Sequence, residues 1–122
     1  MGVFSGCLIC TDLDDTLLTT DKKISAKNKE AIEYFKSEGG LFTFATGRVV
    51  QSVNHYIDII KPNAPIIMYN GCAIYDWEKE KLIHKAILDD DAVDIVRFIM
   101  SSCDFSSIQI VTEDKMYIYR EN

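Results

Sequence analysis

The stretch that decides the fold is residues 8–18, with the sequence LICTDLDDTLL. A short apolar run ends at Asp12, a second aspartate follows at Asp14, and Thr16 comes two residues later. Its length, apolar character and polar flanks predict a buried β-strand, with Asp12 at the carboxyl end and Asp14 in the loop beyond. In an open parallel sheet, ligands bind at that edge.

Two carboxylates held this close repel one another and are costly to desolvate, so a cation between them would be stabilising. Mg²⁺ prefers oxygen ligands, which makes Asp12 and Asp14 candidate metal ligands. A carboxylate beside the metal can attack phosphorus, and a second carboxyl can protonate the leaving oxygen and later deprotonate water. The simpler interpretation of the same residues is an acidic loop that caps the next element.

The pattern Asp-x-Asp-x-Thr after an apolar strand resembles the first motif of the haloacid dehalogenase superfamily of phosphotransferases. The resemblance implies that Asp12 is the nucleophile and Asp14 the general acid/base. It also implies that Mg²⁺ is held by the Asp12 carboxylate and the backbone carbonyl of Asp14. Asp15 stands where many relatives have glycine, a variation that leaves the pattern intact.

A second signal, Thr46-Gly47-Arg48, follows the next predicted strand, residues 41–45. The second motif of the superfamily is a Ser or Thr in this place, whose hydroxyl binds the transferring phosphoryl group, and Thr46 fits it. A hydroxyl and free N–H groups at a helix start suit an anion, and Gly47 would let the backbone approach phosphate. Arg48 either helps to hold phosphate or pairs with a neighbouring carboxylate, and Thr46 is otherwise an ordinary helix N-cap.

The remaining pattern predicts helices over 26–37 and 49–60 and a third strand over 65–69. That strand is followed by Asn70-Gly71, a strong turn signal. The turn resembles the one that faces the active site in Cof-like members of the superfamily, which carry a large α/β cap. Asn70 therefore either contacts phosphate or substrate, or only supplies a left-handed turn residue. A hairpin with a polar tip at 77–81 comes next.

From residue 87 the character changes: an acidic run leads into an amphipathic helix ending near Cys103, and then into strands over 107–112 and 116–120. A helix followed by a hairpin is how the Cof-like cap begins. We therefore expect an α/β fold in which residues 1–84 form the first part of a Rossmann-like parallel-sheet core and residues 85–122 begin an α+β cap domain.

The third and fourth superfamily motifs, a lysine and an acidic pair, follow the cap and have no counterpart in this sequence. The lysines that are present, such as Lys22, lie at positions in the sequence where we expect that they cannot replace the lysine of the third motif. We therefore expect a fragment, or a short relative that has lost catalysis, that is nearly inactive alone. An unpaired edge on its last strand predicts self-association.

Bulk properties limit the functional classes. The chain has 122 residues and a net charge of −6, which disfavours nucleic acid or an anionic membrane as the main partner. Its apolar stretches are too short to span a bilayer, and no signal peptide is evident, so a cytoplasmic location is predicted. Cys7 and Cys10 would point to opposite faces of a strand, which predicts free core thiols rather than a zinc site.

These observations predict a Mg²⁺-dependent phosphatase that acts on small phosphorylated metabolites, for example sugar phosphates, through an aspartyl-phosphate intermediate. Two alternatives remain open. One is a non-catalytic relative that binds phosphate or a partner protein. The other is a phosphomutase, which would return the phosphoryl group to its substrate.

Overall fold

The computed structural model describes residues 2–102, 107–113 and 115–119. The chain divides into two compact units, Met1–Lys85 and Ala86–Asn122, and each is described by itself. The first unit holds all the candidate site residues.

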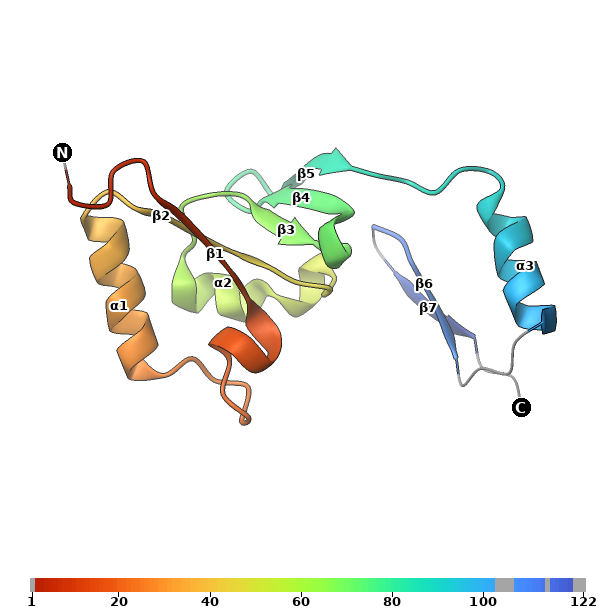
Figure 1. The fold of residues 1–122 in the computed structure, drawn as a ribbon, viewed down its shortest axis with the longest axis horizontal. Coiled ribbons are helices and arrows are strands. Elements are labelled where there is room, and N and C mark those ends of the chain that lie inside the picture. The colour runs from red at the N-terminus through yellow and green to blue at the C-terminus, as the bar shows by residue number, and fades with distance from the viewer. Residues whose placement is uncertain (1, 103–106, 114, 120–122) are drawn as a thin grey trace. The chain divides into compact units, whose positions relative to one another are not determined.

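The first unit is a five-stranded sheet with helices packed against it (Figure 1). Its strands lie in the order β1-β2-β3-β4-β5; the first three are parallel, and β4 and β5 add an antiparallel hairpin. The α/β, Rossmann-like core predicted from the sequence is therefore confirmed. The elements are β1 (Leu8–Asp12), α1 (Ala26–Ser37), β2 (Leu41–Ala45), α2 (Asn54–Ile60), β3 (Ile66–Met68), β4 (Ala73–Asp76) and β5 (Lys81–Lys85).

Helix α1 has the bounds that the sequence predicted. The Ser25 hydroxyl caps its first turn by accepting a hydrogen bond from the Asn28 N–H at 3.1 Å. At the other end, Gly39 takes a positive φ of 87°, a conformation that glycine adopts without steric cost. These two signals explain why both boundaries could be predicted from the sequence.

One hydrophobic core lies between the helices and one face of the sheet. Phe42 and Phe44 are two residues apart on β2 and therefore point to the same face. They pack in a single cluster with Ile32 of α1 and Ile57 of α2. Both helices can cover the same face because parallel crossover connections are almost always right-handed.

The prediction that β1 is buried was wrong. Among the described strands, β1 pairs only with β2, and it is largely exposed, with Leu8 at 59%. Cys7 and Cys10 are free, as predicted, but exposed rather than in the core. The cause is that α1 and α2 follow consecutive parallel strands and cover one face together.

The predicted helix over 49–60 is also not continuous. Residues Val50–Ser52 form a single 3₁₀ turn, and the α-helix begins only at Asn54. The Ser52 hydroxyl donates to the Val49 carbonyl at 2.8 Å, a local bond that competes with α-helical pairing. Consequently Thr46-Gly47-Arg48 does not lie at the start of an α-helix, and an anion site built on a helix terminus is not formed there.

The hairpin tip is less polar than predicted. Trp77 packs against the core, and its Nε1 donates to the Pro62 carbonyl at 2.8 Å. This bond ties the β4–β5 turn to the segment that leaves α2.

The second unit contains α3 (Ala92–Ser102) and a hairpin of β6 (Ile108–Val111) and β7 (Met116–Tyr119). The predicted helix and two strands are therefore present, while Cys103 and Arg120 lie outside the described residues. Within the described part of the chain, none of the helices is long and apolar enough to cross a bilayer.

Candidate functional site

The sheet register brings the two predicted motifs to one edge. Strands β1 and β2 are parallel and pair from Leu8 with Leu41 through Asp12 with Ala45. Asp12 therefore ends β1 next to the residue that precedes Thr46, and neighbouring strands are only about 4.8 Å apart. Asp12 and Thr46 lie at the same carboxyl edge, where parallel sheets bind ligands.

The loop after β1 turns sharply. The Asp12 carboxylate accepts the N–H of Leu13 at 2.8 Å, and the Leu18 N–H closes the turn on the Leu13 carbonyl at 2.9 Å. The Leu13 side chain is fully buried and anchors the loop in the core. Asp15 has a φ of 59°, in the left-handed region, and aspartate tolerates this conformation better than most residues. This geometry gives a physical reason why glycine would suit the same position.

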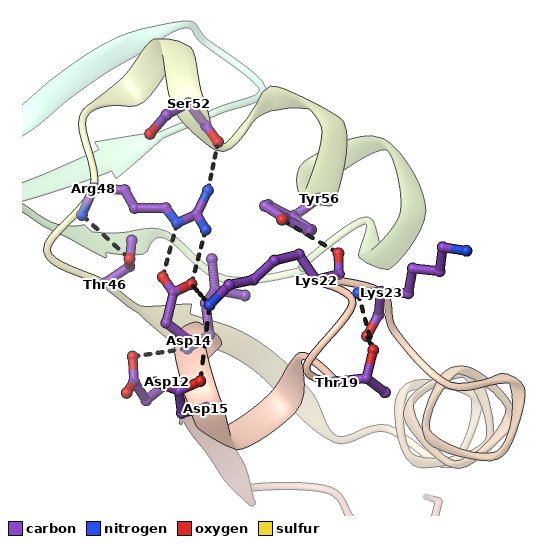
Figure 2. A network of polar contacts seen from close by, with 11 residues as sticks. Asp12, Asp14, Asp15, Thr19, Lys22, Lys23, Thr46, Arg48, Ser52 and Tyr56 are labelled. Atoms are coloured by element: carbon purple, nitrogen blue, oxygen red, sulfur yellow. Dashed lines mark hydrogen bonds and ion pairs between the residues drawn. The ribbon is translucent and has the colours of Figure 1, made fainter.

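A bidentate ion pair joins the two motifs (Figure 2). Arg48 Nε donates to Asp14 Oδ2, and one terminal guanidinium nitrogen donates to Oδ1, each at 2.8 Å. The guanidinium also lies 5.1 Å from the centroid of the Tyr56 ring, within cation–π range. Of the two roles considered for Arg48, this structure shows the pairing with a carboxylate.

Lys22 reaches the same carboxylate. Its Nζ lies 2.9 Å from Asp14 Oδ1 and 3.8 Å from Asp15 Oδ1. Hydrogen bonds from Arg48 and then from Lys22 hold the pKa of Asp14 well below its ordinary value. Lys22 therefore lies beside the candidate site, although it was considered only as a replacement for the missing lysine.

A small hairpin delivers Lys22 to Asp14. Leu18 and Ile24 form an antiparallel bridge, and the Lys22 N–H donates to the Thr19 carbonyl at 2.8 Å. Lys22 itself has a φ of 57°, in the left-handed region, and its side chain points toward Asp14 in Figure 2. No sequence signal marked this residue, because its approach to Asp14 depends on the shape of the turn.

Thr46 is held firmly in place. It is 5% exposed; its N–H donates to the Ile67 carbonyl at 2.9 Å, and its carbonyl accepts from the Asn70 N–H at 3.2 Å. Its hydroxyl oxygen accepts the Arg48 N–H at 3.2 Å, so the hydroxyl proton remains available for an acceptor.

Gly47 and Asn70 approach each other closely. A Cβ at Gly47 would lie 2.5 Å from Asn70 Oδ1, so the absence of a side chain at this position makes room for the amide. Asn70 also has a φ of 56°, the left-handed conformation that the turn requires. The structure therefore brings Gly47 and Asn70 to the Thr46 segment.

The oxygen donors fit a partly hydrated Mg²⁺ better than a fully protein-ligated ion. Asp12 uses one carboxylate oxygen for the Leu13 N–H, and its other oxygen has no hydrogen-bond partner among the described residues. The Asp14 side chain is committed to two cations, which leaves its backbone carbonyl as the donor that the resemblance implies. Within the described residues, no three His, Cys, Asp or Glu side chains form a metal-holding group. Mg²⁺ commonly keeps several waters and takes one or two carboxylates.

Comparison with known proteins agrees with these motifs. A family model described as haloacid dehalogenase-like hydrolase matches residues 9–122. A Bacillus subtilis 5-amino-6-(5-phospho-D-ribitylamino)uracil phosphatase is 39% identical over 84 residues, covering 69% of this chain and 28% of its own. An HMP-PP phosphatase from an Enterobacter species is 33% identical over 89 residues, covering 73% of this chain and 32% of its own.

The fold is also similar to solved structures. A crystal structure of a Thermotoga maritima protein matches with 27% identity and a TM-score of 0.70, over 95% of this chain and 43% of that one. The chain spans about a third of the length of the curated relatives described above.

Proposed function

Because the chain belongs to the haloacid dehalogenase-like hydrolase family, we propose that the whole protein is a Mg²⁺-dependent phosphatase. Its proposed substrates are small phosphorylated metabolites such as sugar phosphates, and its proposed location is the cytoplasm. Two relatives named as phosphatases support this class of reaction. The single observation that carries the proposal is the parallel register that ends β1 at Asp12 beside the residue preceding Thr46.

The proposed reaction has two balanced steps. An Asp12 carboxylate oxygen attacks phosphorus, the bond to the leaving oxygen breaks, and the Asp14 carboxyl gives that oxygen its proton. Water then attacks phosphorus and gives its proton to the Asp14 carboxylate, and the bond from phosphorus to Asp12 breaks. The products are an alcohol and inorganic phosphate, with both aspartates restored.

Thr46 would orient the phosphoryl group. Its hydroxyl oxygen already accepts one N–H, so its proton can be donated to a phosphoryl oxygen. Its buried position and two backbone hydrogen bonds keep that donor fixed, which favours catalysis by positioning. Bound Mg²⁺ would neutralise negative charge shared by Asp12 and the phosphoryl oxygens.

In the structure, both carboxylate oxygens of Asp14 act as hydrogen-bond acceptors. Three N–H donors from Arg48 and Lys22 point at its two oxygens. To act as an acid, Asp14 must lose at least some of these hydrogen bonds and take up a proton. The two cations can then bind the incoming phosphoryl dianion instead. The proposed cycle therefore includes a change of partner by the cations.

Substrate choice is proposed to belong to another part of the protein. We propose that Ala86–Asn122 is the beginning of a cap domain that selects the leaving group, as the resemblance implies. The phosphoryl site and the selecting surface would then be separate features of one protein.

The test is phosphate release from a panel of phosphomonoesters by the whole protein, with and without Mg²⁺. Asp12→Asn should abolish release, because an amide cannot act as the nucleophile. The matched control is Asp21→Asn, which makes the same change in an exposed turn residue of the same loop and should leave release intact. Phosphate release that survives Asp12→Asn would contradict the proposal, and an isomeric product without free phosphate would indicate a mutase.

A further inference from the structure

We propose that Lys22 is a phosphate-binding residue of this site, whose ammonium moves from Asp14 to the phosphoryl oxygens when an anion enters. The inference rests on the proposed function and adds to it a residue that neither predicted motif contains. The hairpin formed by residues 18–24 then presents the Lys22 side chain to the site and is not only a connection between β1 and α1.

The first argument is position. The Lys22 ammonium and one guanidinium nitrogen of Arg48 share a single acceptor, Asp14 Oδ1, at 2.9 and 2.8 Å. Arg48 follows Thr46 by two residues, and its backbone N–H donates a hydrogen bond to the Thr46 hydroxyl oxygen. The ammonium therefore lies at the same carboxylate that joins the two motifs, as Figure 2 shows.

The second argument is charge. Asp12 ends β1, and Asp14 and Asp15 lie in the loop directly after it. A phosphoryl dianion brought to this edge would meet their combined negative charge. In the contacts around Asp14, the positive charges come from Arg48 and Lys22. Phosphate binding in an acidic site requires such cations close to the oxygens.

The third argument is freedom to move. The Lys22 side chain is 49% exposed, whereas Arg48 is 26% exposed and is also held by the Tyr56 ring. A flexible ammonium on a four-carbon stem can change partners with little rearrangement. The backbone of Lys22, in contrast, is fixed by the turn bond to Thr19, so the side chain swings from a defined point.

The experiment measures binding of inorganic phosphate to the whole protein in excess Mg²⁺ by titration calorimetry. Lys22→Met, which keeps the stem and removes the charge, should weaken binding about tenfold. Lys22→Arg should restore most of the affinity. The matched control is Lys23→Met, because Lys23 is the next residue and points away from Asp14 in Figure 2, while its loss changes the net charge equally. It should change the affinity less than about twofold.

A background lacking the Asp14 charge separates direct binding from a structural role. If Lys22 only positioned Asp14, then Lys22→Met would have no effect on phosphate affinity in an Asp14→Asn chain. Direct binding predicts that Asp14→Asn alone tightens phosphate binding, since it frees a cation and removes a repulsion, and that Lys22→Met still weakens it in that background.

The possible failures can be told apart. Unchanged affinity in Lys22→Met, an equal loss in Lys23→Met, or no loss in the Asp14→Asn background would each overturn the role of Lys22. In those cases a loss of binding in Thr46→Val would leave the proposed function standing. If the unmodified whole protein binds no phosphate, the proposed phosphoryl site itself is contradicted, and the role of Lys22 with it.

Discussion

The Arg48–Asp14 pair can be measured directly by a double-mutant cycle. The changes are Arg48→Met, Asp14→Asn and the two together, each followed by urea unfolding at neutral pH. The pair is bidentate, with both bonds at 2.8 Å, and the two side chains are 26% and 35% exposed. Fully exposed ion pairs contribute about 0.2–1 kcal/mol, and removal of one partner from a buried pair costs about 3–5 kcal/mol. The intermediate exposure predicts a coupling free energy of about 1–2 kcal/mol.

The control cycle uses the same chemistry without the burial. Asp94 and Arg97 of α3 form a single contact at 3.4 Å, with side chains 82% and 76% exposed. Their coupling should be below about 0.3 kcal/mol. A coupling below that value at Arg48–Asp14 would refute the idea that this pair holds the two motifs together.

The pH dependence of the same measurement has a definite sign. The folded-state pKa of Asp14 lies below its unfolded value, so the unfolded chain binds more protons as the pH falls. The stabilisation by this carboxylate is complete above the unfolded pKa, which is about 3.9, and is lost as the pH falls towards the folded value. The difference in unfolding free energy between the unmodified chain and Arg48→Met should therefore shrink below about pH 4. A difference that stays constant or grows there would contradict the assignment.

Three further changes test the site and its support. Gly47→Ala should displace the Asn70 amide, since the new Cβ would lie 2.5 Å from its oxygen; calorimetry should show several-fold weaker phosphate binding, and unchanged affinity would exclude a role for this close approach. Phe44→Ala removes a fully buried ring and should cost about 3–5 kcal/mol in urea unfolding, while a loss under about 1 kcal/mol would mean that the core is not packed as described. Trp77→Phe removes the Nε1 bond to the Pro62 carbonyl and should cost about 1 kcal/mol in the same assay, with no loss showing that the bond is not maintained in solution.

Local signals were enough to predict most of the first unit. The bounds of α1 and β2 follow from the Ser25 cap, the Gly39-Gly40 stop and a continuous apolar run, all of which act over a few residues. The shared edge of Asp12 and Thr46 could also be foreseen, because parallel strands place their carboxyl ends together.

The errors depend on tertiary arrangement. An apolar strand sequence indicates burial, yet β1 is exposed because α1 and α2 cover one face of the sheet and only β2 pairs with β1 among the described strands. Lys22 reaches Asp14 from a turn in which its own φ is positive. Lysine seldom adopts that conformation, so the sequence does not predict it. The break in the second helix is also not marked in the sequence, because the apolar spacing of residues 49–60 continues through the 3₁₀ turn of Val50–Ser52.

The central claim is that Asp12 and Thr46 serve one phosphoryl group. The most direct measurement is fluorine NMR of beryllofluoride, an analogue of a carboxylate-bound phosphoryl group, added to the whole protein with excess Mg²⁺. We predict bound resonances for the unmodified protein, none for Asp12→Asn, and much weaker binding for Thr46→Val. The claim would be contradicted by bound resonances that persist in Asp12→Asn, or by a beryllofluoride affinity that Thr46→Val leaves unchanged.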